Sequence, residues 1–114
     1  SAKGIWAIET DKKTSLLITT ADFRPVSQKL KLTVSPYQTN SASPLVNIKS
    51  CNYLENLLAF EEAKKRGFDE AIRLNEKGEI VSACLANIFW LKGDEIFTPS
   101  VKTGCLAGTT REFI

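Results

Sequence analysis

The stretch Asn47-Ile48-Lys49-Ser50-Cys51-Asn52-Tyr53 decides how the rest of this sequence is interpreted. It places a lysine in a short polar link, directly before the expected start of a helix. Most lysines are solvated, so Lys49 alone is weak evidence for a site. Strand-like segments precede it, and the segments that follow could form the walls of a pocket. Lys49 is therefore the first candidate for a functional residue.

One long helix is expected over residues 53–66. Asn52 is the predicted N-cap, with Glu55 three residues later in a box-like arrangement. Gly67 can take the left-handed conformation that ends a helix. The first turns are apolar on more than one side, which predicts that the helix start is buried. The apolar residues concerned are Leu54, Leu57, Leu58 and Phe60.

Short β-prone segments surround this helix and predict hairpins on both sides of it. The predicted strands cover residues 4–10, 15–20, 30–34, 71–74, 79–83, 87–91 and 95–98. Residues 23–28 contain a proline and indicate an irregular link. A loop rich in Ser, Pro and Asn covers residues 35–47 and leads to Lys49. Loops of this length are often functional.

Composition excludes several classes of function. The chain has 114 residues, which predicts one domain, and a net charge of +2, which is too small for a nucleic-acid-binding surface. It has no His, so Ser-His or Cys-His catalysis and His-based metal sites are not expected. No apolar run is long enough to cross a membrane.

The three cysteines are odd in number and show no C-x-x-C spacing, which argues against disulfides and zinc. Free thiols predict a reducing, cytoplasmic location. The chain contains no Met and starts with Ser1, and its last residues resemble the first turn of a helix. We therefore expect a piece of a longer protein. A sheet edge left open in such a piece could pair with a second copy, giving a homodimer.

A second candidate site is Gly108-Thr109-Thr110, at the start of the last predicted helix. Free backbone N–H groups and the positive end of the helix dipole would favour an anion there. The alternative is a capping box, in which Thr109 and Glu112 satisfy the same donors internally. This stretch alone favours the capping box.

Taken in order, these features resemble the fold-type IV pyridoxal-phosphate enzymes. This family includes class IV aminotransferases, such as branched-chain and D-amino-acid aminotransferases, and aminodeoxychorismate lyase. The resemblance implies a mixed α/β fold, with a curved, mainly antiparallel sheet or partial barrel and one long helix after the lysine. The matching segments are 43–45, 49–54, 62–63, 67–71, 78–81, 87–89, 98–99 and 106–111.

The resemblance also implies cofactor contacts for individual residues. Lys49 falls on the lysine that forms a Schiff base with pyridoxal phosphate and then moves a proton. Tyr53 falls on the tyrosine that hydrogen-bonds the ring oxygen, and Leu106 on the residue that packs against the ring. Thr109 and Thr110 fall on the phosphate cup. Asn87 matches an asparagine expected to give structural support.

Ser82 departs from the family pattern. It stands where the family has a glutamate that keeps the pyridine nitrogen protonated and makes the ring a strong electron sink. A serine hydroxyl can hydrogen-bond this nitrogen but supplies no charge. Glu79 is three residues away, which places it on the opposite face of a strand, so it is not expected to compensate.

We interpret residues 1–114 as part of the large cofactor-binding domain, with the small N-terminal domain and the C-terminal remainder absent. The expected reaction is transfer of an amino group between an amino acid and a 2-oxo acid. The alternatives are pyruvate elimination, as in aminodeoxychorismate lyase, and a non-catalytic module that no longer binds the cofactor. The fragment alone is expected to be inactive. No metal, nucleic-acid or membrane partner is predicted.

Overall fold

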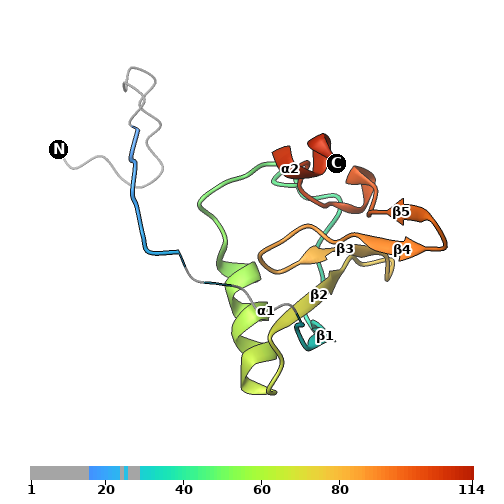
Figure 1. The fold of residues 1–114 in the computed structure, drawn as a ribbon, viewed down its shortest axis with the longest axis horizontal. Helices are drawn as coiled ribbons and strands as arrows, with labels where there is room; N and C mark the ends of the chain where they lie inside the picture. Colours follow the sequence, from blue (N-terminus) through green and yellow to red (C-terminus); the bar gives the residue numbers. More distant parts are fainter. Residues whose placement is uncertain (1–15, 24, 26–28) are drawn as a thin grey trace.

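The structure is a computed structural model that describes residues 16–23, 25 and 29–114. It has the expected mixed α/β fold (Figure 1). The elements, in chain order, are β1 (Leu32–Val34), α1 (Leu54–Lys65), β2 (Glu70–Leu74), β3 (Ile80–Ala83), β4 (Trp90–Lys92), β5 (Glu95–Phe97), the 3-10 helix η1 (Val101–Thr103) and α2 (Thr109–Phe113).

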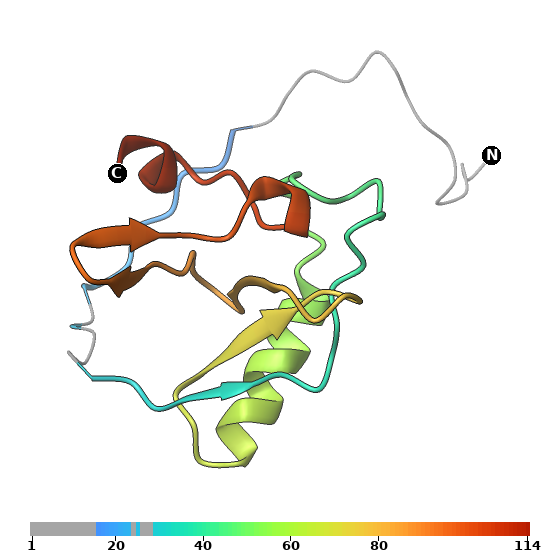
Figure 2. The ribbon, with the colours of Figure 1, turned by 90° about the vertical axis from the view of Figure 1, so that its right-hand side faces the viewer.

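The described strands form two sheets and no closed barrel. In the first, β1 pairs with β2 in parallel and β2 pairs with β3 in antiparallel orientation, giving the order β1-β2-β3. In the second, β4 and β5 form an antiparallel hairpin. Antiparallel pairing therefore predominates, as expected. The parallel pair needs a crossover connection, which α1 provides by lying across β1 and β2 (Figure 2).

Small side chains allow α1 to approach the sheet closely. Ala59 and Ala63, four residues apart on one face of the helix, are both fully buried. They form a core with Ala71 of β2 and Cys84, against which Phe60 and Phe68 pack.

The predicted burial of the helix start is wrong. The side chains of the first turns project away from the sheet because the alanines occupy the inner face. The exposed residues are Leu54, Leu57 and Leu58.

The helix ends differ in how well the sequence predicted them. At the C-terminal end, Gly67 adopts φ +82° and Phe68 donates its backbone N–H to the carbonyl of Ala63, so the predicted left-handed stop is confirmed. At the N-terminal end, the N-cap is Tyr53 and no side chain caps the helix. The prediction that Asn52 caps the helix is therefore wrong: Asn52 precedes the N-cap residue, and its backbone N–H is held by the Ser50 hydroxyl two residues earlier.

Other predicted strands are confirmed only in part. Residues 16–20 form no strand, and residues 4–10 lie outside the described residues, as does most of the 23–28 link. β4 begins at Trp90, so residues 87–89 of the predicted strand are irregular. Polar groups at these positions bond elsewhere: the Asn87 amide donates to the Leu106 carbonyl, and the Ile88 backbone carbonyl accepts from the Thr98 hydroxyl.

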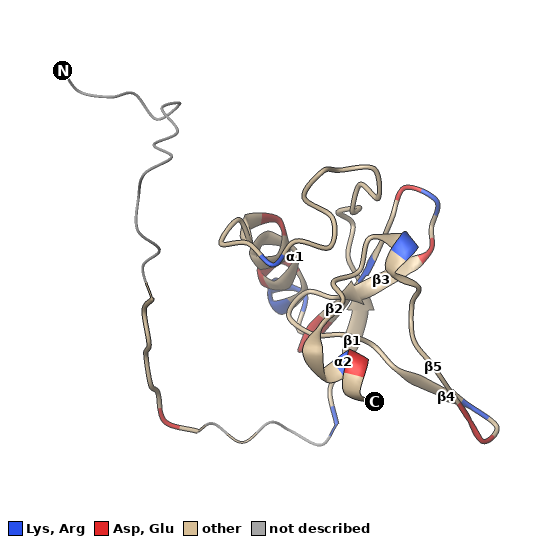
Figure 3. Ribbon diagram, turned by 90° about the horizontal axis from the view of Figure 1, so that it is seen from above, with Lys and Arg blue, Asp and Glu red and all other residues tan. Residues whose placement is uncertain are grey.

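Charged residues of both signs are interspersed along α1 and at the hairpin tips (Figure 3). Along α1, Glu55 lies in the first turn, and Lys64 and Lys65 lie in the last turn, which complements the helix dipole. Within the described part of the chain, no helix has the length and apolarity needed to cross a membrane.

Candidate functional site

A cavity of about 410 Å³ lies between the end of the long loop, β3 and the start of α2. Its volume falls within the range of about 300–1,000 Å³ that is usual for small-molecule sites. All six predicted cofactor residues line it, although they come from three separate parts of the sequence. These residues are Lys49, Tyr53, Ser82, Leu106, Thr109 and Thr110.

Lys49 and Tyr53 form one wall of this cavity. The Lys49 amine lies 5.8 Å from the centroid of the Tyr53 ring, within range of a cation–π contact. Tyr53 is half-buried and is fixed as the N-cap residue of α1. Lys49 itself is exposed to the cavity and solvent, so its amine is accessible to a ligand. The structure therefore brings both residues to one cavity.

Asn47 was not predicted as part of the site, yet it lines the cavity two residues before Lys49. It is the only non-glycine residue with a positive φ in the described part of the chain, at 66°. Asparagine tolerates this left-handed conformation better than most residues. The left-handed turn at Asn47 therefore changes the direction of the backbone just before Lys49.

Asn87 and Gly108 shape the opposite wall. The Asn87 amide donates a 3.1 Å hydrogen bond to the Leu106 carbonyl. A Cβ built on Gly108 would lie 2.6 Å from the Asn87 amide oxygen, a distance that real Cβ atoms do not tolerate. Only glycine therefore allows Asn87 to support the loop that carries Leu106. This geometry is consistent with the supporting position predicted for Asn87.

Helix α2 starts at Thr109, with Gly108 as its N-cap and no side-chain cap. The capping box of Thr109 and Glu112, favoured by the local sequence, is therefore not formed. The first backbone N–H groups of a helix have no acceptor within it. Those of Thr109 and Thr110 thus remain available at the cavity wall, as a phosphate group requires.

Ser82 lies half-buried in the cavity wall. Glu79 is not among the lining residues, because its carboxylate accepts a 2.7 Å hydrogen bond from the fully buried Asn75 amide. Glu79 consequently supplies no charge at the Ser82 position, as predicted.

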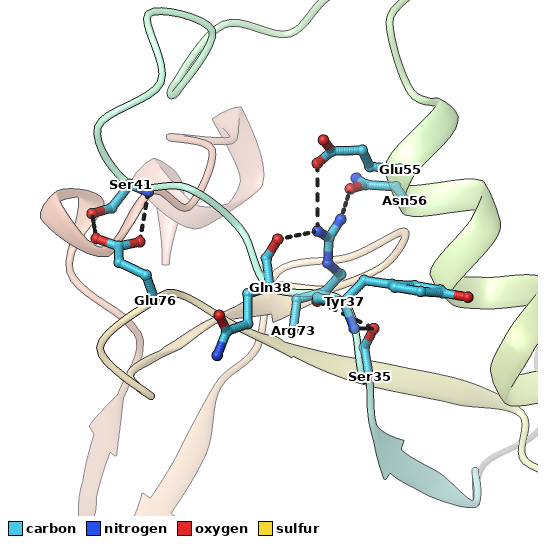
Figure 4. A network of polar contacts seen from close by, with 8 residues as sticks. All are labelled: Ser35, Tyr37, Gln38, Ser41, Glu55, Asn56, Arg73 and Glu76. Carbon is cyan, nitrogen blue, oxygen red and sulfur yellow. Dashed lines mark hydrogen bonds and ion pairs between the residues drawn. The ribbon is translucent and has the colours of Figure 1, made fainter.

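Arg73 is a buried charge that sequence reasoning missed. It lies on β2 with only 2% of its surface exposed, and it reaches toward α1 (Figure 4). Its guanidinium hydrogen-bonds the Asn56 side chain and the Gln38 carbonyl and pairs with Glu55 at 3.6 Å. The sequence does place Arg73 inside the predicted 71–74 strand. A charged residue that is buried in a strand needs polar partners, and this position could have identified it as a candidate.

The long loop is tied to the β2–β3 turn through Glu76. The Glu76 carboxylate accepts hydrogen bonds from the Ser41 hydroxyl at 2.5 Å and from the Ser41 backbone N–H at 2.9 Å (Figure 4). These bonds lower the pKa of Glu76 to about 2. A second attachment is the backbone bond from Thr39 to Leu74. The loop that leads to Lys49 is thus anchored to the sheet at its first half.

The turn after β3 is held by Glu70. Its buried carboxylate accepts from the backbone N–H groups of Cys84 and Leu85, so it orders the segment that follows Ser82. Burial raises the pKa of the Cys84 thiol to about 11, and the neighbouring Glu70 acts in the same direction. All three cysteines are free thiols, as the sequence predicted.

Fold and cavity together define a mixed α/β unit with a lysine, hydroxyl groups and a helix start around one small-molecule site. Residues 1–114 match the family described as amino-transferase class IV. The chain belongs to this family.

Relatives in the family carry two different activities in their names. The aminodeoxychorismate lyase of Bacillus subtilis is 36% identical over 116 residues, which is 100% of this chain and 39% of that protein. The branched-chain-amino-acid aminotransferase of Pseudomonas aeruginosa is 42% identical over 62 residues, which is 54% of this chain and 20% of that protein. The chain thus spans well under half the length of these relatives.

Solved structures agree with this assignment. A Legionella pneumophila protein assigned as a 4-amino-4-deoxychorismate lyase superposes with a TM-score of 0.77 and 29% identity, covering 83% of this chain and 35% of that one. A Brucella abortus aminotransferase bound to pyridoxal phosphate superposes with a TM-score of 0.72 and 27% identity, covering 82% and 34%. Pyridoxal phosphate is the cofactor that the family and these structures indicate.

Proposed function

We propose that this chain is the pyridoxal-phosphate-binding portion of a class IV enzyme, part of its large domain, and that Lys49 is the residue that reacts with the cofactor. The observation that carries the proposal is the convergence of six residues, predicted independently of the structure, on one cavity of about 410 Å³. The donor set fits the cofactor. An accessible amine and the uncapped start of α2 line the same cavity, and Gly108 leaves the space that Asn87 occupies.

The cofactor supplies a ring that withdraws electrons from a bound amino acid. The chain supplies positioning. Thr109 and Thr110 would hold the phosphate with backbone N–H groups and hydroxyls, Leu106 would pack against the ring, and Tyr53 would hydrogen-bond the ring oxygen. Lys49 would provide the amine and would carry a proton to or from the substrate carbon, as a general acid and base must.

Two activities follow from the family: amino transfer between an amino acid and a 2-oxo acid, and pyruvate elimination as in aminodeoxychorismate lyase. The match to the Bacillus subtilis lyase supports pyruvate elimination. The Bacillus subtilis lyase aligns with 100% of this chain, whereas the Pseudomonas aeruginosa aminotransferase aligns with 54%. Assays of the full-length protein for pyruvate release from aminodeoxychorismate and for amino transfer to a 2-oxo acid separate the two.

Cofactor attachment is tested on the chain itself. The chain is incubated with pyridoxal phosphate and reduced with borohydride, and the modified lysine is mapped by peptide mass spectrometry. We expect modification at Lys49, its loss in Lys49→Arg, and no change in Lys65→Arg, a matched replacement at the exposed end of α1. Modification spread over surface lysines, or unaffected by Lys49→Arg, contradicts the proposal.

We further propose a cytoplasmic homodimer. Its support is the chain's free thiols and the exposed apolar side chains on the outer face of α1 and on the β4–β5 hairpin. Sedimentation of the full-length protein tests the dimer, and a monomer at micromolar concentration contradicts it.

A further inference from the structure

We infer that this cavity holds the pyridine nitrogen of the cofactor in its unprotonated form, and that the buried Arg73 acts as the positioning residue for that charge state. This inference rests on the proposed function. Ser82 stands where the family has a glutamate, and no other residue of the described site supplies a carboxylate in its place.

The charges of the cavity wall are the first observation. Among the described residues that line the cavity, Lys49 is the only ionised one, and it is a cation. The remaining polar side chains are neutral hydroxyls and amides, on Asn47, Tyr53, Ser82, Asn87 and the two threonines. A protonated ring nitrogen is a cation and is stabilised by a nearby carboxylate. Wherever the nitrogen lies in this cavity, the described lining residues offer it no negative charge.

The position of Arg73 is the second observation. Arg73 of β2 is the direct register partner of Ser82 of β3. Directly opposed residues of an antiparallel pair lie on the same face, with Cβ atoms about 4.5–5.5 Å apart. Arg73 therefore stands beside the cavity wall, on the side from which Ser82 contributes. The guanidinium extends from this position toward Asn56 and Gln38. A cation on this side of the wall disfavours a second positive charge on the ring.

The charge of Arg73 is only partly compensated. Glu55, its ion-pair partner at 3.6 Å, has a side chain that is 80% exposed, so water screens the carboxylate. The other partners, the Asn56 side chain and the Gln38 carbonyl, are neutral. Its Nε atom is buried and has no hydrogen-bond partner among the described residues. A positive field thus remains behind Ser82.

The nearby carboxylates are already engaged. Glu70 accepts from the backbone N–H groups of Ala71, Cys84 and Leu85 on the far side of the β3 turn. Glu79 is bonded to Asn75. Neither lines the cavity. A neutral ring withdraws electrons less strongly than a protonated one, so proton transfer depends more heavily on the placement of Lys49.

The test is nitrogen-15 NMR of the 114-residue chain loaded with pyridoxal phosphate labelled at the ring nitrogen, recorded across neutral pH. We expect the bound nitrogen to resonate as unprotonated pyridine at neutral pH. Ser82→Glu is expected to raise the pKa of the ring nitrogen by about 1 to 3, because it adds the missing carboxylate. Arg73→Gln is expected to shift it in the same direction by a smaller amount.

Three control variants separate charge from structure. Ser82→Ala removes the hydroxyl without adding charge, and Arg73→Lys keeps the cation, so both should leave the nitrogen unprotonated. Arg66→Gln makes the same charge change at the end of α1, away from the cavity, and should have no effect. If Arg73→Gln does not fold, Ser82→Glu carries the test by itself.

The outcomes distinguish this inference from the proposed function. A bound cofactor whose nitrogen is protonated at neutral pH in the unaltered chain, or one that Ser82→Glu does not shift, overturns the inference and leaves cofactor binding intact. Cofactor that stays free, with no modification of Lys49 after reduction, overturns both.

Discussion

Two regions of this molecule differ sharply in packing. The layer made by β1, α1, β2 and β3 contains a core of fully buried small residues, Ala59, Ala63, Ala71 and Cys84. In the β4–β5 hairpin, by contrast, every residue of both strands is exposed, and the hairpin is held mainly by its own ladder and by stacking of Trp90 on Phe97. The cavity lies where the packed layer meets the loop and helix that follow the hairpin.

The two regions contribute to the cavity in different ways. The packed layer fixes Ser82, Arg73 and Tyr53 within elements whose positions are set by burial. The hairpin side supplies Leu106 and the start of α2 and reaches the packed layer through a few polar links. These are the bonds from Asn75 to Thr103 and from Asn87 to Leu106. Those links therefore contribute to the geometry of the cavity.

The largest effect is expected for Asn75→Ala. The Asn75 side chain is fully buried and makes four hydrogen bonds, which join the β2–β3 turn to η1. Its removal takes away four part-buried hydrogen bonds and should lower the free energy of unfolding by about 3 kcal/mol. Denaturant melts measure this loss. Asn40→Ala, which removes one exposed turn bond, should change stability by less than about 0.5 kcal/mol.

The next effect compares the two regions directly. Ala63→Leu inserts a large side chain into the packed layer, where Ala63 has no exposed surface, and should cost about 1–3 kcal/mol of unfolding free energy. Leu91→Ser in the hairpin, where the leucine is 73% exposed, should change it by no more than about 0.5 kcal/mol. Equal losses in the same melts would show that the hairpin is as tightly packed as the layer.

A smaller, pH-dependent effect is expected where the loop meets the β2–β3 turn. The folded-state pKa of Glu76 is lowered from 4.5 to about 2, so its contribution to stability is present above pH 4.5 and is lost as the pH falls toward 2. Hydrogen-exchange protection of the Ser41 N–H should fall over this range. Glu76→Gln should remove the pH dependence, while Glu61→Gln, on the exposed side of α1, should retain it.

The smallest effect is chemical and leaves the fold unchanged. The pKa of Cys84 is raised from the usual 9 to about 11. Below pH 9 the fraction of Cys84 present as thiolate is therefore roughly a hundredfold lower than for an ordinary cysteine, and burial also blocks access to the sulfur. Limited alkylation followed by peptide mapping should modify the exposed Cys51 well before Cys84. For Cys84 the sign is opposite to that for Glu76: its contribution to stability is lost as the pH rises from 9 through 11. Modification of Cys84 at the rate of Cys51 would show that the packed layer opens readily.

Local chemistry explains which elements could be predicted from the sequence. Gly67 after two lysines and Arg66 predicted the end of α1, because few other residues adopt φ +82° at low cost. Alternation in residues 30–34 predicted β1, and the Asn75–Gly78 turn predicted the β2–β3 pair. The start of α1 and the burial of its leucines were missed. Both depend on which helix face meets the sheet, and close packing of Ala59 and Ala63 decided that.

The sequence by itself identified the family and named six candidate site residues, because short motifs keep their order and spacing along the chain. Only the tertiary structure decided what surrounds those residues. It brought residues 47–53, 82–87 and 106–110 to one cavity. It also placed Asn87 so close to position 108 that only glycine fits there, and it paired Arg73 with Ser82 on neighbouring strands. Strand register and burial create these neighbours, and neither is a property of any local stretch of sequence.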